Sequence, residues 1–244
     1  MLKRLYEKSK IIFAVLWIVL YCVLMSVGDA LSAMLSVEKS VTLAVALLLS
    51  VVLIFFLKKN GLFASYGLTV PRATAKSMLY YIPVFAMLTA NFWYGAAFNY
   101  SALETVLYIL TMLLVGFLEE IIFRGLLFEA MRKDSRMAAV IVSSITFGIG
   151  HIINLINGSG AELIPSLLQI VYATAAGFMF VMIYLKSKSL IVCIVSHGVF
   201  NAMSAFGREA VATPEARILS AVILTAITGG YALYLALTLK RENL

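Results

Sequence analysis

Ionisable and amide side chains stand inside three strongly apolar stretches of this chain, where each is costly in hydrocarbon unless it is paired or hydrated. The three stretches contain, in order, Glu119, Glu120 and Arg124; Phe147 and His151; and His197 and Asn201. A carboxylate, two imidazoles and an amide can together position a water molecule, accept its proton and stabilise an oxyanion. These residue types indicate hydrolysis of a peptide bond within a membrane.

Helical spacing assigns different tasks to the two neighbouring acids. Glu120 and Arg124 are i,i+4 neighbours and are expected to form an ion pair, whereas Glu119 points about 100° away and stays free. Gly116, one turn before the pair, predicts the close approach of another helix. His197 and Asn201 are also i,i+4 and present one polar stripe.

We therefore expect Glu119 to be the general base, with Glu120 as its paired neighbour and Arg124 in support. His151 is expected to help hold the water, and His197 with Asn201 to stabilise the oxyanion. In an alternative arrangement, Glu119, His151 and His197 hold a divalent metal such as zinc. The single-helix H-E-x-x-H signature is absent, and the cofactor stays open between a metal and none.

The elements that carry these residues must be membrane-spanning helices. Of the 244 residues, 63% are hydrophobic and 13% are charged, which excludes an ordinary soluble domain. Both cysteines lie in apolar runs, which excludes a disulfide framework. The fold expected is an all-α integral membrane protein, a single polytopic domain over 1–244 with its catalytic core at about 102–204. Eight spans are expected, at roughly 11–35, 41–57, 78–98, 103–131, 137–156, 164–185, 189–206 and 216–239.

The basic residues predict the orientation of these spans. With both termini in the cytoplasm, Lys39, Arg208 and Arg217 are the basic residues that fall outside. The cytoplasmic segments then hold Lys3, Arg4, Lys8, Lys10, Lys58, Lys59, Arg72, Lys76, Arg124, Arg132, Lys133, Arg136, Lys186, Lys188, Lys240 and Arg241. Topology thus explains the net charge of +7, and the partners expected are the lipid bilayer and a peptide or protein substrate, with no nucleic acid.

A depth estimate tests whether the three polar stretches could meet. At a rise of about 1.5 Å per residue, Glu119, His151 and Asn201 each lie about 20 Å from the cytoplasmic ends of their helices, and His197 about 14 Å. Three helices that are not consecutive therefore place polar groups in one layer, which is what an internal site requires.

The three motifs, E-E-x-x-x-R at Glu119, F-x-x-x-H at Phe147 and H-x-x-x-N at His197, occur in the order seen in one known family. The chain resembles the CAAX protease and bacteriocin-processing family of intramembrane peptidases, also called the Abi family, over about residues 102–204. The resemblance implies an eight-helix, multi-pass protein of the cell membrane whose two Glu, two His and one Asn line a cavity open toward the cytosolic leaflet. It also implies cleavage of peptides such as prenylated CAAX-type tails or bacteriocin-like peptides, by metal-bound or glutamate-activated water.

Other interpretations of the same residues stay open. The cavity could serve a bacteriocin immunity protein that binds a peptide without cleaving it, or a proton-coupled transporter, although no internal repeat supports the latter. Phe123 and Phe147 are expected to pack, and Cys193 to be an inert buried thiol and not a nucleophile. Asp29 and Glu104 are expected at the outer ends of spans, and Gln169 is ambiguous between helix packing and cavity lining.

Overall fold

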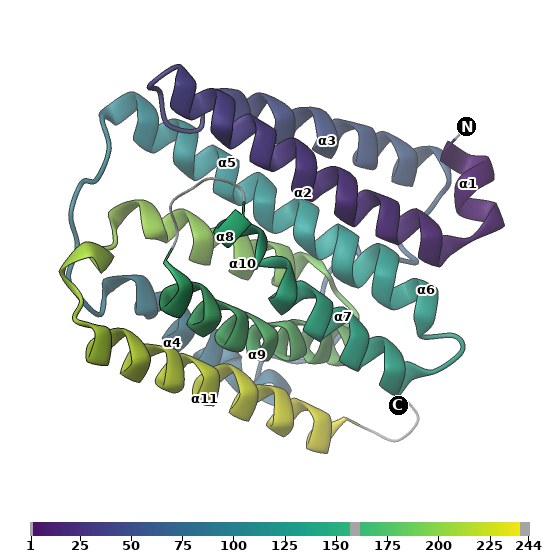
Figure 1. Cartoon of the computed structure of the whole chain (residues 1–244). Coiled ribbons are helices and arrows are strands. Elements are labelled where there is room, and N and C mark those ends of the chain that lie inside the picture. Colours follow the sequence, from purple (N-terminus) through teal and green to yellow (C-terminus); the bar gives the residue numbers. More distant parts are fainter. Residues whose placement is uncertain (1, 157–161, 240–244) are drawn as a thin grey trace.

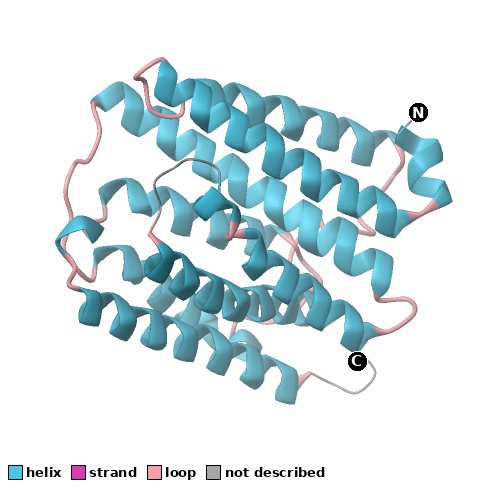
Figure 2. Cartoon of the chain, viewed as in Figure 1, coloured by secondary structure: helices cyan, strands magenta, loops and turns pink. Residues whose placement is uncertain are grey.

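The computed structural model describes residues 2–156 and 162–239 and places them in a bundle of helices (Figure 2). Among these residues, the extended backbone forms a single antiparallel bridge, between Ala96 and Gly207. The same residues include six helices long and apolar enough to cross a membrane: Lys10–Met34, Ser40–Lys59, Ala102–Met131, Arg136–Leu155, Leu163–Ser187 and Pro214–Thr238. The all-helical, multi-pass membrane architecture expected from the composition is therefore confirmed.

The first two long helices, α2 (Lys10–Met34) and α3 (Ser40–Lys59), form a hairpin that follows the short helix α1 (Leu2–Lys8) (Figure 1). At its turn Lys39 takes the left-handed conformation, with φ of 57°. Asp29 accepts hydrogen bonds from Lys39 Nζ and Thr42 Oγ1, both at 2.7 Å, and so ties α2 to α3 at this turn.

One continuous helix carries the two adjacent acids. Its first part, α5 (Ala102–Glu120), begins with a capping box in which Ser101 and Glu104 satisfy each other's backbone N–H groups. After Glu120 the helix widens into a π-helical segment, η3 (Ile121–Phe128), and ends in α6 (Glu129–Met131). All eight residues of η3 are buried, so the helix is surrounded by other helices at this level.

The remaining long helices pack around this one through small residues. They are α7 (Arg136–Gly150), which the one-turn α8 (Ile153–Ile156) follows, α9 (Leu163–Ser187), α10 (Ile191–Met203) and α11 (Pro214–Thr238). A Cβ atom at Gly116 would clash with the backbone of Gly198, so α5 and α10 touch there, as Gly116 predicted. A Cβ at Gly148 would clash with Thr174 of α9.

Two of the eight expected spans are not long helices. The stretch expected at 78–98 is broken into η1 (Lys76–Tyr81), α4 (Ile82–Leu88) and η2 (Thr89–Phe92). Leu79, Tyr80 and Tyr81 all have positive φ, and Pro83 stands in the first turn of α4, so no helix continues through this point. The other, α10, is a shorter apolar helix, of 16 residues once η4 (Ser204–Phe206) is included. Six of the expected spans are thus confirmed as long helices.

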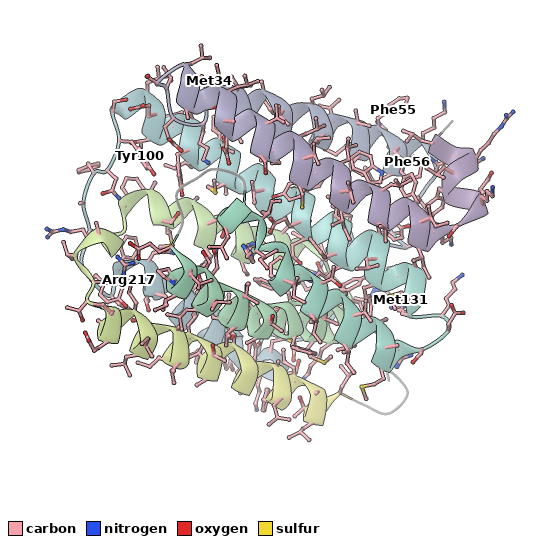
Figure 3. All side chains as sticks on the ribbon, in the orientation of Figure 1. Met34, Phe55, Phe56, Tyr100, Met131 and Arg217 are labelled. Carbon is pink, nitrogen blue, oxygen red and sulfur yellow. The ribbon has the colours of Figure 1, made fainter. Side chains whose placement is uncertain are left out.

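The bundle has two different ends, at which Met34 and Met131 lie in Figure 3. The basic end holds the start of α2, the end of α3, α6, and the last turns of α9 and α11, with Lys58, Lys59, Arg132, Lys186 and Lys188. The opposite end holds the α2–α3 turn, the start of α5 and the loop before α11. We call it the cavity end, because a large cavity is lined there by the exposed Asp29.

Candidate active site

Glu120 and Arg124 form the expected ion pair in the centre of the bundle. Arg124 Nη1 donates to Glu120 Oε1 at 2.9 Å, and both side chains are 0% exposed. Arg124 Nη2 also donates to the carbonyl of Gly177 on α9, at 3.3 Å. The guanidinium lies 4.2 Å from the centroid of the Phe147 ring. The sequence analysis placed Arg124 in a cytoplasmic segment, and the structure shows that it is a core residue instead. Its burial is tolerated because Glu120 and the Phe147 ring replace the interactions that the guanidinium would make with water.

His197 links the two acids. Its Nδ1 lies 2.9 Å from Glu120 Oε1, the same oxygen that accepts from Arg124, and its Nε2 lies 3.5 Å from Glu119 Oε2. A carboxylate accepts and does not donate, so the hydrogen of this bond is on Nδ1. The imidazole stacks on Phe180, with the ring centroids 5.4 Å apart. The Glu120 pair thus fixes the ring orientation and aims Nε2 at Glu119.

Glu119 occupies the boundary between this packed core and open space. Tyr21 of α2 donates to its Oε1 at 2.7 Å. Its Oε2 is buried and has no hydrogen-bond partner among the described residues, although the side chain as a whole is 12% exposed. The carboxylate is thus held through one oxygen by Tyr21 and lies in the wall of a cavity, which is where a general base is needed.

A cavity of about 420 Å³ contains this carboxylate. Glu119, His151 and Asn201 all line it, so the structure brings together these three residues from α5, the end of α7 and α10. The cavity extends to Asp29 and Lys39 at the α2–α3 turn, where the Asp29 side chain is 40% exposed. It therefore reaches the surface at the cavity end and not at the basic end.

A smaller cavity of about 50 Å³, here called the inner chamber, adjoins this space. His151, His197 and Asn201 line the inner chamber together with the rings of Phe147 and Phe200. A space of this size holds about one water molecule or one small polar group. The polar residues of the three motifs thus line two neighbouring cavities, one large and one small, with His151 and Asn201 in the wall of both.

Of the two glycines near His151, Gly150 leaves space beside the ring and Gly148 does not. Gly150 lines the large cavity, and a Cβ there would meet Phe123 no nearer than 4.0 Å, so space remains beside His151. Gly148 was expected to leave space as well, but Thr174 fills that position. Phe147 lies edge-on to both imidazoles, with centroids 5.6 Å from His151 and 5.5 Å from His197, and it packs on Phe123. The expected packing role of these phenylalanines is confirmed.

Several residues outside the three motifs also reach the site. The sequence analysis missed Tyr21, although a tyrosine in the middle of an apolar span is a signal, because its hydroxyl needs a buried partner. Asp29 was expected at the outer end of a span, and it also lines the large cavity. Gln169 both lines this cavity and accepts from Asn154 Nδ2 at 3.1 Å, so both interpretations of it hold.

Cys193 is the buried thiol that the sequence predicted. It is 0% exposed, and its Sγ lies 3.3 Å from the carbonyl oxygen of Phe180, to which it donates. Neither cavity of the site includes it in its wall. It is not placed to act as a nucleophile on anything in these cavities.

The alternative metal arrangement was tested on the positions of the side chains. Across residues 2–156 and 162–239, no three His, Cys, Asp or Glu side chains are grouped so that they could hold a metal ion. Glu119, His151 and His197 therefore do not form a ligand set as they stand, because His197 already spans the two carboxylates. No step of the mechanism below passes through a metal.

A family model described as type II CAAX prenyl endopeptidase Rce1-like matches residues 101–203. The resemblance to the CAAX protease family is confirmed. The Rce1-like segment runs from the capping box of α5 to the end of α10, and it contains all three motifs. Tyr21 and Asp29 lie outside it. No curated protein was found to match the chain.

Proposed function

We propose that this protein is an intramembrane endopeptidase in which Glu119 activates the attacking water. The observation that carries the proposal is the position of the Glu119 carboxylate. It lies in the wall of a 420 Å³ cavity, with Oε1 held by Tyr21 and Oε2 unpaired beside the imidazole of His197. The Rce1-like match supports protease chemistry on a peptide or protein substrate in a membrane.

In the proposed reaction, a water molecule in the large cavity gives its proton to the Glu119 carboxylate as its oxygen attacks the carbonyl carbon of the substrate. His151, which lines both spaces, holds this water. The carbonyl oxygen that becomes negative enters the inner chamber, where the Asn201 amide donates a hydrogen bond to it beside the His197 ring. The proton on Glu119 then passes to the leaving nitrogen, and the carbon–nitrogen bond breaks.

The test uses purified protein in detergent with quenched peptide libraries, prenylated and unprenylated. We expect turnover in the wild type and in Cys193→Ala, and none in Glu119→Ala or His151→Ala that elute as folded protein. Turnover retained in Glu119→Ala would reject the assignment of the base. Peptide binding without turnover in the wild type would favour the immunity-type function, and gradient-driven uptake without turnover would favour a transporter.

We also propose that the chain crosses the cell membrane eight times, with both termini and the basic end in the cytoplasm. The buried Arg124 no longer counts toward this orientation, and Lys240 and Arg241 lie outside the described residues. The lysines and arginines on the loops of the basic end still outnumber Lys39, Arg208 and Arg217 at the other end.

This orientation disagrees with the cytosolic opening that the resemblance implied. The large cavity reaches the surface at Asp29 and Lys39, and this end would then face away from the cytoplasm. Such a cavity favours exported peptides, such as bacteriocin-like peptides, over tails made in the cytoplasm. Single cysteines placed at Lys39 and at Lys188 in a variant without Cys22 and Cys193 test the point. A membrane-impermeant maleimide added to whole cells should label the first and not the second, and the reverse pattern would invert the orientation.

A further inference from the structure

A third cavity, of about 550 Å³, shares no lining residue with the candidate active site. It is a groove between α7, α9 and α11, and among the described residues of its wall Arg136 is the charged one. The apolar wall includes Val140, Phe178, Met182 and Ala236. We call it the lateral groove.

The lateral groove has the length and the exposure of a site for part of an acyl chain. Its lining residues run from Ala175 to Met182 on α9 and from Gly229 to Ala236 on α11, about 10 Å along each helix. Leu233 and Met137, which also line it, are 60% and 71% exposed, so the groove opens to the surroundings of the bundle. In a membrane these surroundings are lipid.

Positive charge gathers where the groove meets the basic end. Arg136 Nη1 is buried and has no hydrogen-bond partner within the described part of the chain. Arg132 is the C-cap of α6, Arg136 begins α7 and Lys188 is the C-cap of α9, where the N–H of Arg72 donates to the Ser187 carbonyl at 2.8 Å. Burial, together with the positive charges of these neighbours, lowers the pKa of Lys188. Of the two acids here, Glu129 already pairs with Arg132 at 3.1 Å and accepts from Tyr184 at 2.7 Å, and Asp134 is exposed in the turn before α7.

We propose that the lateral groove binds an anionic phospholipid, with an acyl chain along α9 and α11 and the headgroup phosphate on Arg136. The apolar wall excludes a polar ligand, and the guanidinium of Arg136, which lines the groove, offers positive charge to the phosphate. The cations at the ends of α6 and α9 and at the start of α7 favour an anionic headgroup over a zwitterionic one. The site is independent of the peptidase chemistry proposed above.

The chain offers matched variants for both parts of this site. A Cβ at Gly229 meets no atom within 4 Å, so Gly229→Leu fills the groove without strain. A Cβ at the adjacent Gly230 is equally free, but Gly230 does not line the groove, so Gly230→Leu is its control. For the headgroup, Arg136→Gln is compared with Lys133→Gln, which changes an exposed cation that does not line the groove.

The experiment is native mass spectrometry of delipidated protein with added dioleoylphosphatidylglycerol or dioleoylphosphatidylcholine. We expect the wild type and both controls to retain phosphatidylglycerol in preference to phosphatidylcholine. Arg136→Gln should lose this preference, and Gly229→Leu should retain several-fold less of either lipid. Equal retention of the two lipids by the wild type would overturn the proposal. Displacement of phosphatidylglycerol by a farnesylated peptide would also overturn the proposal, because it would assign the groove to the peptide. A wild-type dimer that Gly229→Leu dissociates would overturn it as well, because it would assign the groove to a second copy of the chain.

Discussion

The two neighbouring acids, Glu119 and Glu120, occupy opposite environments although one helix carries both. Glu120 is 0% exposed, and its Oε1 accepts from Arg124 and from His197. Glu119 lines a cavity and is 12% exposed, although the Oε2 atoms of both acids have no hydrogen-bond partner among the described residues. The comparison teaches that two consecutive residues of one helix can face a closed ion-pair core and the wall of a cavity. We expect chemistry to depend on the first acid and stability on the second.

The largest effect expected is on turnover in Glu119→Gln. This isosteric change removes the base and keeps the volume, so peptide cleavage should fall by about 10² to 10⁴-fold. The melting temperature in detergent should stay close to the wild-type value, because the carboxylate has a single hydrogen-bond donor, Tyr21. A fluorogenic peptide assay and a thermal unfolding scan measure the two quantities on the same sample. A large loss of stability with normal turnover would reverse the roles of the two acids.

The core side of the comparison is tested by Arg124→Ala. This variant leaves Glu120 buried without its cation, and the expected cost is about 3 to 5 kcal/mol in the free energy of unfolding. The double variant Arg124→Met/Glu120→Leu removes both charges and should recover much of this loss. Denaturant unfolding in mixed micelles gives both values. If the double variant is as unstable as the single one, the ion pair is not the source of the effect.

Tyr21→Phe tests whether the hydrogen bond from Tyr21 to Glu119 contributes to turnover. It removes one hydrogen bond to a carboxylate, which is worth about 1.5 to 3 kcal/mol, so kcat/KM should fall by about 10- to 100-fold. The matched control is Tyr6→Phe, which removes the 2.7 Å bond to Tyr66 at the basic end and should leave turnover unchanged. Equal loss of turnover in both variants would point to a general effect on folding.

The smallest effect concerns Lys39, at the rim of the large cavity. Burial lowers the pKa of Lys39, but the charges of Asp29 and Glu38 outweigh it and hold the pKa above its ordinary value. A raised pKa of a base stabilises the fold below the unfolded-state pKa of about 10.4, and this stabilisation disappears as the pH rises through the folded-state pKa. Unfolding curves should therefore show about 1 kcal/mol or less of alkaline destabilisation, which Lys39→Met abolishes. An unchanged alkaline loss in Lys39→Met would assign it to another group.

The sequence predicted much of this fold, because apolar length alone decides which segments can cross a bilayer. Six spans agree with long helices of the structure. The break at Leu79–Tyr81 was not predicted, since no glycine stands there to mark it and Pro83 is compatible with the first turn of a helix. The residue types at positions 79–81 do not predict that all three take positive φ.

Within the site, spacing along one helix was enough for some pairs. Glu120 and Arg124 were found because i,i+4 neighbours share a helix face whatever surrounds them. The position of His197 between Glu119 and Glu120 was not predicted. It depends on how α10 is aligned against α5, which is set where Gly198 packs on Gly116, and the sequence of either helix alone does not specify this alignment. Tyr21 lies on α2, outside the Rce1-like segment, and is not part of any of the three motifs, so the sequence analysis did not connect it with Glu119.

The sequence by itself determined that this is a helical membrane protein with a carboxylate, two imidazoles and an amide at similar depths, because hydropathy and helical rise are local properties. Tertiary structure alone decided that Glu120 is paired and Glu119 is open. It also decided that the cavity reaches the surface at the end of the bundle that holds few basic residues. The physical reason is that burial, charge pairing and cavities arise between helices, where side chains distant in the chain compete for the same space.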